Sequence, residues 1–457
     1  MSILNNALSG ATAAQIALAA SSQNIANLQT KGYTRQSALL SALGPAQGSA
    51  NQSGNGVQVT SLLRFSDGYK SQQLWRAASD LGAYSQTQPY LTQIEQVMGD
   101  DESNLSNGVD QFFAALNAVA GVDPTSTPLR QQVVAAAGLM SQRFNSLNNV
   151  FNAQLQSIRQ QRGAIVDEAN GDIAAIAALN GQIANAHASG ANTSALIDAR
   201  DQAIDSLAGK MALEVTDQPD GSRNVSLKNG QSLVLGSVGG KLAVDGGLEQ
   251  TFSLTFAGTT FQLDPTGAGG ELGGLSTYLR DTLEPLRQGV AELAEQLATK
   301  VNDQLAQGTT MDGNPGKPLF VYNPGNPSNM LQVADGFQTG DLAFSGDGKP
   351  GDTGNLQKLV ALKNEKITLT RVGDVLIADA DTQLVGKLAV DSQQNKGALN
   401  TAQTVRDQSV ADWQSTSGVN EDEEAVNLVE YQKMYQANLK VISVANALFD
   451  ATLAMMG

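Results

Sequence analysis

Apolar residues recur every three or four positions at both extreme ends of this chain, and this pattern constrains the fold more than any other feature. The first 30 residues carry no charged side chain, and Lys31 is the first one. Such spacing places side chains along one stripe of an α-helix, as in coiled coils. Gly10 lies inside the stretch and costs about 1 kcal/mol of helix stability relative to Ala. The N-terminal stripe comprises Leu4, Leu8, Ala11, Gln15, Leu18, Ser22 and Ile25.

The last 40 residues show the same alternation. We expect Asn420 to cap this helix, with Glu423 at the third helical position closing a capping box. The acidic run 421–424 suits the positive end of the helix dipole, and its adjacent carboxylates point in different directions, which argues against a cation site. The C-terminal stripe comprises Ala425, Leu428, Gln432, Tyr435, Leu439, Ile442, Asn446, Phe449, Leu453 and Met456.

Neither terminal helix can bury its stripe alone. One fully buried Leu, Ile or Phe contributes about 1.5–3 kcal/mol, so pairing is favoured once a partner is present. We expect the two chain ends to pair with each other and to be mobile in the monomer. The remaining apolar flanks then require neighbouring copies, and these flanks contain Ile3, Ile16, Val429, Val441 and Leu448.

Between the two ends, the sequence predicts a helical body with two β-rich excursions. Helices are expected at 68–98, 103–121, 128–188, 194–209, 275–306 and 384–417, with Pro285 kinking the fifth helix or resetting its start. Residues 211–274 alternate with period two between turn residues and predict a β-meander. Residues 310–383 are rich in Gly, Pro, Asn and Asp, with short strands expected at 319–322 and 367–376.

The predicted fold class is mainly α with β-rich insertions (α+β). The architecture is a long α-helical bundle rod, with paired terminal coiled-coil helices and outer β-rich domains. The expected domains are a terminal helical domain (1–40 plus 420–457), a helical body (41–210 plus 275–309 plus 384–419), a β-meander attached to the body (211–274) and a small β-rich outer region (310–383).

Composition argues against several classes of function. The 457 residues include no Cys and one His, which excludes thiolate chemistry and multi-histidine metal sites. His187 is expected to be an ordinary residue near a helix end. A formal charge of −16 argues against nucleic-acid binding. The sequence contains no apolar run of about 18 residues, which is the length that a membrane-spanning helix needs. The Gly-rich segments 267–270 and 313–317 lack phosphate-loop spacing. We therefore expect no catalytic residues, no cofactor and no metal.

Short motifs follow the N-terminal stripe. Residues 22–27 read SQNIAN, and residues 32–36 read GYTRQ. This combination resembles the N-terminal signature of the bacterial flagellar axial proteins, a family of rod, hook and hook-associated proteins. Residues 417–424 and 432–442 resemble the other end of the same family. The N-terminal motif positions are Asn24, Gly32, Tyr33, Thr34, Arg35 and Gln36.

Interior segments extend the resemblance to the hook-associated branch of this family. They are residues 55–59 (NGVQV), 196–201 (LIDARD) and 270–275 (GELGGL). The resemblance implies a structural protein, not an enzyme, that forms the junction between hook and filament and provides the base for the next junction protein and the filament. The alternative is another axial protein, such as a hook or distal rod protein, because these share the end motifs. The long predicted helix 128–188 favours the junction protein.

The resemblance also implies partners and a location. Copies of the chain would form a ring of about eleven protofilaments, a helical array of the kind that head-to-tail interfaces generate. The other expected partners are the hook protein, the second hook-associated junction protein and an export chaperone on the C-terminal helix. The chain would reach the extracellular flagellum through the flagellar type III apparatus, without a cleaved signal peptide. No nucleic acid and no membrane insertion are expected.

The residues expected to carry assembly lie on the two stripes. The N-terminal interface is assigned to Leu4, Leu8, Ala11, Gln15, Leu18, Ile25 and Asn27. The C-terminal interface, which would also bind the chaperone, is assigned to Leu428, Gln432, Tyr435, Asn438, Leu439, Ile442, Phe449 and Leu453.

Overall fold

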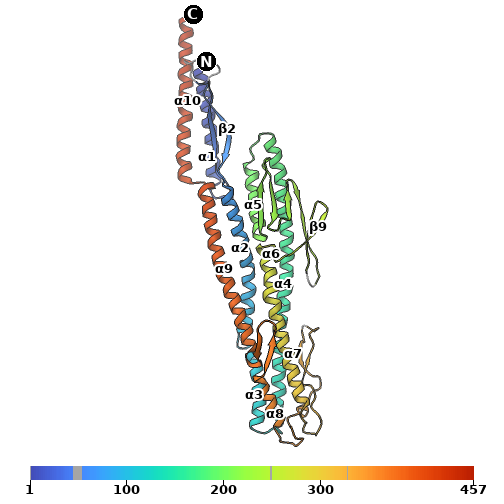
Figure 1. Ribbon diagram of the computed structural model, residues 1–457. Helices are drawn as coiled ribbons and strands as arrows, with labels where there is room; N and C mark the ends of the chain where they lie inside the picture. The colour runs from blue at the N-terminus through green and yellow to red at the C-terminus, as the bar shows by residue number, and fades with distance from the viewer. Residues whose placement is uncertain (1, 45–53, 248–249, 327, 457) are drawn as a thin grey trace.

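The computed structural model describes residues 2–44, 54–247, 250–326 and 328–456, and it shows an elongated helical rod (Figure 1). Both chain ends lie at one end of the rod, and the short helix α8 lies at the other. Long helices and small antiparallel sheets make up the described residues. The predicted fold class, mainly α with β-rich insertions, is confirmed.

The elements follow the chain in this order. The helices are α1 (Ser2–Ala26), α2 (Gly68–Gly99), α3 (Leu105–Gly121), α4 (Thr127–Ala188), α5 (Ser194–Lys210), α6 (Gly270–Tyr278), α7 (Glu284–Ala306), α8 (Gly354–Ala361), α9 (Ala380–Ser417) and α10 (Glu421–Met456). The strands are β1 (Gln36–Ala42), β2 (Val57–Arg64), β3 (Leu213–Asp217), β4 (Arg223–Leu227), β5 (Ser232–Leu235), β6 (Val238–Gly239), β7 (Lys241–Val244), β8 (Phe252–Phe256), β9 (Thr259–Leu263), β10 (Phe320–Tyr322), β11 (Leu331–Val333), β12 (Lys366–Leu369) and β13 (Gly373–Leu376). Short 3₁₀ turns occupy Thr339–Asp341, Leu362–Asn364 and Ile377–Asp379.

Helix α4 is the backbone of the body. Its 62 residues span about 93 Å at 1.5 Å per residue. Its apolar side chains are buried, as at Phe144, Phe151 and Ile165. Helix α2 packs lengthwise against α9 and also contacts α5 and α6. The helices predicted at 68–98, 103–121, 128–188, 194–209 and 384–417 are all present within a few residues of their expected ends.

The helix expected at 275–306 is divided in two. A π-helical turn over Leu279–Leu283 separates α6 from α7, and Pro285 stands in the first turn of α7. Proline has no N–H to donate, so it fits a first turn and breaks the hydrogen-bond ladder further in. Pro285 therefore resets the helix start, which is one of the two outcomes expected for it.

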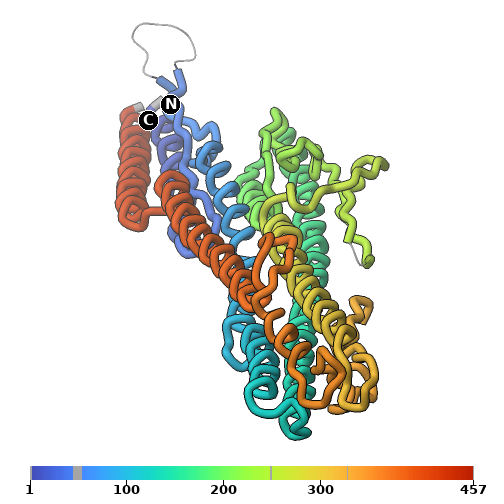
Figure 2. Tube along the Cα trace, turned by 60° about the horizontal axis from the view of Figure 1, so that its bottom comes forward, coloured from blue at the N-terminus to red at the C-terminus, as the bar shows by residue number. Residues whose placement is uncertain are grey.

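The segment 211–274 contains two antiparallel meanders. Strands β3, β4, β5 and β6 form one sheet in chain order, and β7, β8 and β9 form the other. Val215 pairs with Val225, so the residues of the period-two pattern meet across neighbouring strands. The sheets pack on α4 and stand out from the side of the rod (Figure 2).

The segment 310–383 is mixed instead of purely β-rich. It holds the two-stranded sheets β10–β11 and β12–β13. Strand β10 matches the strand expected at 319–322, the range 367–376 holds the hairpin β12–β13, and β11 was not predicted. It also contains α8, which contacts α3 and α7 and was not predicted. Eight residues give too few turns for an apolar period to be read from the sequence.

The sequence also gave no indication of the hairpin β1–β2. Gln36 pairs with Arg64 and Ala42 with Val57, with a bulge between Leu39 and Leu40. The hairpin packs along α1, although residues from 41 onward were expected to belong to the helical body. Strand β1 reads QSALLSA, which does not alternate cleanly, and so the period-two signal is weak.

Candidate assembly site at the paired chain ends

The two chain ends form one helical pair. Helices α1 and α10 run antiparallel side by side in both views (Figures 1 and 2). The hairpin β1–β2 covers another side of α1. The predicted pairing of the two ends within one chain is therefore confirmed.

The side of α1 that is buried is not the predicted stripe. Of that stripe, Ala11 is buried, whereas Leu8 is 56% exposed and Gln15 is also exposed. Leu4, Leu18, Ile25 and Asn27 are half-buried. The buried side of α1 consists largely of alanines, and α10 and the hairpin β1–β2 cover it together. The buried alanines are Ala7, Ala11, Ala13, Ala14, Ala17 and Ala20.

Helix α10 buries very little of itself. Among its described side chains, Glu424 alone is buried, at 5% exposure. Of the predicted C-terminal positions, Leu428, Tyr435, Asn438 and Ile442 are half-buried. Gln432, Leu439, Phe449 and Leu453 are exposed. The predicted stripe is thus divided between the face toward α1 and the outer surface.

Gly10 is explained by the close approach of α10. A Cβ atom at Gly10 would lie 2.6 Å from Oδ1 of Asn438. Because real Cβ contacts are longer, a side chain at this position would push Asn438 aside. Gly10 lowers the intrinsic stability of α1, but it allows α10 to pack closely against α1 at this position.

The C-terminal part of α10 extends beyond the start of α1. Gly10 lies opposite Asn438, and Asn24 lies opposite Glu424. In this antiparallel register the start of α1 faces the vicinity of residue 446, and roughly ten residues of α10, or 15 Å, continue past it. Figure 1 shows this overhang. Phe449 and Leu453 lie on it, which accounts for their exposure.

Asn24 is the centre of a buried polar cluster. Its side-chain amide donates to Oε1 of Glu424 (2.9 Å) and to the carbonyl of Gln36 (2.8 Å). Its Oδ1 accepts from the Gln36 backbone N–H (3.0 Å) and from the Tyr33 hydroxyl (2.9 Å). Ser21 Oγ donates to Oε2 of Glu424 at 2.5 Å. One side chain thus connects α1, the following turn, β1 and α10.

The start of α10 differs in part from the prediction. Oδ1 of Asn420 accepts from the backbone N–H groups of Asp422 (3.0 Å) and Glu423 (3.3 Å), so the N-cap is confirmed. The Glu423 carboxylate instead pairs with Arg35 at 2.8 Å and does not close the expected capping box. Acidic residues at this helix start therefore bind the N-terminal motif.

The turn after α1 is anchored to α5. Gly32 has φ +76°, and a Cβ there would lie 2.6 Å from the Gln202 side chain. Gln202 donates to the Lys31 carbonyl at 2.5 Å. The backbone N–H of Thr34, which is fully buried, donates to Asp198 at 3.2 Å.

Burial, with the Asp198 carboxylate nearby, raises the pKa of the Tyr33 phenol, so this hydroxyl remains neutral and can donate a hydrogen bond.

Asp198 and Asp201 extend this network into the body. Arg64 of β2 donates to Asp198 at 2.7 Å and lies 3.2 Å from Asp201. Arg223 of β4 pairs with Asp201 at 2.5 Å. Sequence reasoning missed Arg64 and Arg223, although the LIDARD segment that holds both aspartates was recognised. The motif residues of the chain ends and of α5 therefore form one continuous polar junction.

The outer surface of α10 is rich in exposed apolar side chains. They are Val426, Val429, Met434, Leu439, Val441, Val444, Leu448, Phe449, Leu453 and Met455. On α1, Ile3 and Leu8 are exposed as well. Exposed apolar surface of this extent marks an interaction site.

The central part of the chain matches a known family. The family model described as "Flagellar hook-associated protein FlgK helical domain" matches residues 91–320, which is half of the chain. The chain belongs to the FlgK family of flagellar hook-associated proteins. A second model, "Flagellar basal body rod FlgEFG protein C-terminal", matches residues 413–455 and so covers α10.

Curated FlgK-family relatives match along the whole length. The "Flagellar hook-associated protein 1" of Salmonella typhimurium is 28% identical over 99% of both chains. The Escherichia coli protein of the same name is 27% identical over 98% of this chain and 99% of its own. The Bacillus subtilis protein is 26% identical over 99% of this chain and 98% of its own.

A solved FlgK structure supports the fold. The flagellar hook junction protein FlgK from Burkholderia pseudomallei superposes with a TM-score of 0.52 at 28% identity. The match covers 55% of this chain and 47% of that chain, so it spans about half of the solved structure.

Membership in the FlgK family gives the general role. The chain is a structural component of the bacterial flagellum, and it interacts with other flagellar components. Its relatives are hook-associated structural proteins and not enzymes, which confirms the non-enzymatic prediction. In the described residues, none of the helices combines the length and apolarity that a bilayer span requires.

Proposed function

We propose that this chain forms the junction between hook and filament by helical self-assembly through α1 and α10. In this role it provides the base for the second hook-associated junction protein and for the filament. The observation that carries the proposal is the apolar outer surface of α10, on a helix that buries one described side chain of its own, Glu424. Neighbouring copies would supply the missing contacts.

The first helix supports the same arrangement. Its alanine face is used within the chain, and Leu8 and Ile3 remain outside for a second copy. Because the first 30 residues carry no charged side chain, copies of α1 can approach one another without repulsion between side chains. The predicted interface residues Leu4, Leu18 and Ile25 are half-buried and retain area for such contacts.

We assign the layers of the assembly as follows. Residues 1–40 with 420–457 would form the inner tube of a ring of about eleven protofilaments. The helical body would surround this tube, with residues 211–274 and 310–383 further out. The hook protein and the second junction protein would contact opposite ends of the ring. Before export through the type III apparatus, without a cleaved signal peptide, a chaperone would cover the exposed side of α10.

A charge on the outer surface of α10 tests this proposal. Leu439 is 44% exposed, so Leu439→Asp should leave the monomer folded and block junction assembly, because a carboxylate would have to be buried between copies. Ile442→Asp should also block assembly, but it faces α1 and would disturb the helical pair as well. The matched control is Gln436→Asp, which adds the same charge at an exposed polar position.

The measurement is electron microscopy of a strain that lacks its own copy and carries each variant. We expect hooks without filaments, and flagellin shed into the medium, for Leu439→Asp, and normal filaments for Gln436→Asp. Circular dichroism of the purified variants reports whether each is folded. Normal filaments with folded Leu439→Asp protein would reject the proposed interface.

A further inference from the structure

A cavity opens on the side of the rod, far along the chain from the paired ends. It has a volume of about 1010 Å³ and lies between α4 and the segment formed by α6, the π-helical turn and α7. Gln250 and Pro265, from the β-rich excursion, close one side. A space of this size is in the range of small-molecule sites.

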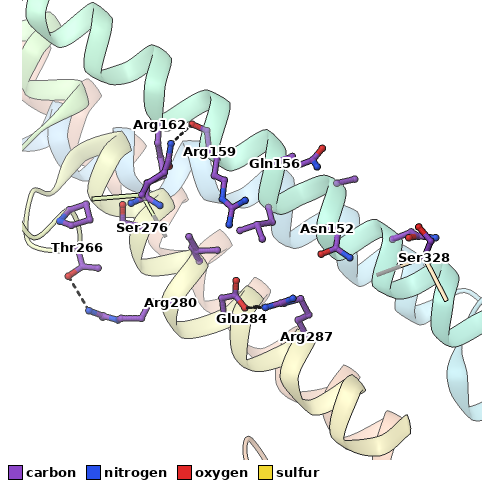
Figure 3. A pocket seen from close by; sticks show the side chains of 16 residues that line it. Asn152, Gln156, Arg159, Arg162, Thr266, Ser276, Arg280, Glu284, Arg287 and Ser328 are labelled. Atoms are coloured by element: carbon purple, nitrogen blue, oxygen red, sulfur yellow. Dashed lines mark hydrogen bonds and ion pairs between the residues drawn. The ribbon is translucent and has the colours of Figure 1, made fainter. Parts of the chain in front are cut away.

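The charge of this cavity is opposite to that of the whole chain. The described lining residues include Arg159, Arg162, Arg280 and Arg287 but only one acid, Glu284. The chain as a whole has a formal charge of −16. Figure 3 shows Arg159 and Arg162 projecting from α4, with Arg280, Glu284 and Arg287 on the facing helical segment.

Arg280 and Arg287 pair with carboxylates of their own helical segment. Arg287 pairs with Glu284 at 2.7 Å. Arg280 pairs with Asp281 at 2.6 Å and also donates to Thr266 at 3.0 Å. Both therefore contribute little net positive charge to the cavity.

Arg162 is different. Its side chain is 4% exposed, its guanidinium lies 4.4 Å from the Phe252 ring centre, and its Nε is buried without a hydrogen-bond partner in the described parts of the chain. Burial, with Arg159 adding repulsion, lowers the pKa of Arg162 to about 10, so the group is still a cation at neutral pH. Burying a charge without a counter-charge is strongly unfavourable.

We propose that this cavity is a binding site for a small oxyanion, a carboxylate or a phosphate, held by Arg162. A guanidinium presents a planar set of donors that matches both oxyanions, and such charge-assisted hydrogen bonds are among the strongest in proteins. Because Arg162 pairs with no carboxylate in the described parts of the chain, a bound anion would supply its counter-charge.

The test uses the purified full-length chain and two probes. Sodium phosphate and sodium citrate are titrated by calorimetry at neutral pH, against sodium chloride of equal ionic strength. We expect saturable binding of at least one probe and a matching rise in the thermal unfolding temperature. The stronger probe identifies the preferred anion. Absence of saturable binding for both probes overturns the proposal.

Two variants localise the binding. Arg162→Lys keeps the positive charge and the apolar stem, so it should fold, but it loses the planar donor set and should bind at least about tenfold more weakly. Lys228→Gln is the control, because it removes one positive charge from an exposed position that does not line the cavity. Equal binding by folded Arg162→Lys and the parent chain would overturn the assignment to this residue.

Discussion

Glu424 shows how one side chain can connect the two ends of a chain of this length. It is the buried acid in a run of four, and it accepts hydrogen bonds from Ser21 and Asn24 of α1. Its neighbour Glu423 is exposed and pairs with Arg35. The sequence identified the run as favourable for the helix dipole, but it gave no means to tell which carboxylate points inward. The partners lie about 400 residues away in the sequence.

We expect Glu424→Gln to loosen the α1–α10 pair. The substitution keeps the size of the side chain but removes the charge that strengthens two hydrogen bonds, each contributing about 1.5–3 kcal/mol when charged. Amide exchange across α1 and α10, read by mass spectrometry, should become several-fold faster. Glu423→Gln is the control, since an exposed ion pair contributes about 0–1 kcal/mol. Equal exchange in both variants would contradict the role given to Glu424.

At the scale of elements, periodicity predicted which segments form helices but not which faces meet. The predicted stripe on α1 followed the leucines, whereas the buried side of this helix uses alanines, with Gly10 at the close approach of α10. Apolarity ranks Leu above Ala, but the closeness of two helices depends on the shape of both surfaces. That information is not contained in either segment alone.

The polar cluster around Asn24 and the cavity beside Arg162 also depend on partners that are distant in the sequence. The motif residues Asn24, Gly32 and Tyr33 were identified by resemblance, and the structure brings them together with α10 and α5. In the sequence, Arg162 is one polar residue within the predicted helix 128–188, and nothing there marks it as buried. Its burial follows from Phe252 of β8, about 90 residues away, so sequence periodicity could not show it.

The crossing of α2 and α6 offers a sharp test at this scale. A Cβ at Gly274 would lie 2.3 Å from the carbonyl oxygen of Ala83, so Gly274→Ala must separate the two helices and should lower the free energy of unfolding by about 1–3 kcal/mol. A Cβ at Gly273 would make ordinary contacts of 3.5 Å, so Gly273→Ala should be neutral or stabilise by about 0.5–1 kcal/mol.

Urea denaturation followed by circular dichroism measures both variants against the parent chain. The two positions are adjacent and both lie in α6, so helix propensity changes equally and cancels between them. Indistinguishable midpoints for the two variants would show that α2 and α6 tolerate a wider spacing than the structure implies.

At the scale of the whole molecule, burial is very unevenly distributed. Helix α4 carries buried side chains from end to end, whereas α10 buries Glu424 among its described side chains. Local opening is easiest where few side chains are buried. The free chain should therefore have a stable body and weakly held ends.

We expect amide exchange in the monomer to be fast over residues 1–40 and 420–457 and slow over α4, which serves as the reference within the same sample. Assembly should protect both ends, because sister copies cover the exposed side chains. The measurement is exchange followed by mass spectrometry, at a concentration where ultracentrifugation shows a single copy. If the two ends of the monomer exchanged as slowly as α4, the proposal that neighbouring copies stabilise these ends would be contradicted.

The overhang of α10 makes the two poles of the molecule unlike. At one pole a single helix projects with Phe449 and Leu453 exposed, whereas α3 and α8 lie packed together at the opposite pole (Figure 1). A contact that covers this projection with a different surface of the next copy is a head-to-tail interface. Such an interface gives every copy the same direction and leaves one unoccupied binding surface at each end of the stack. We therefore expect stacks of this chain to be polar, with growth at their two tips proceeding at different rates.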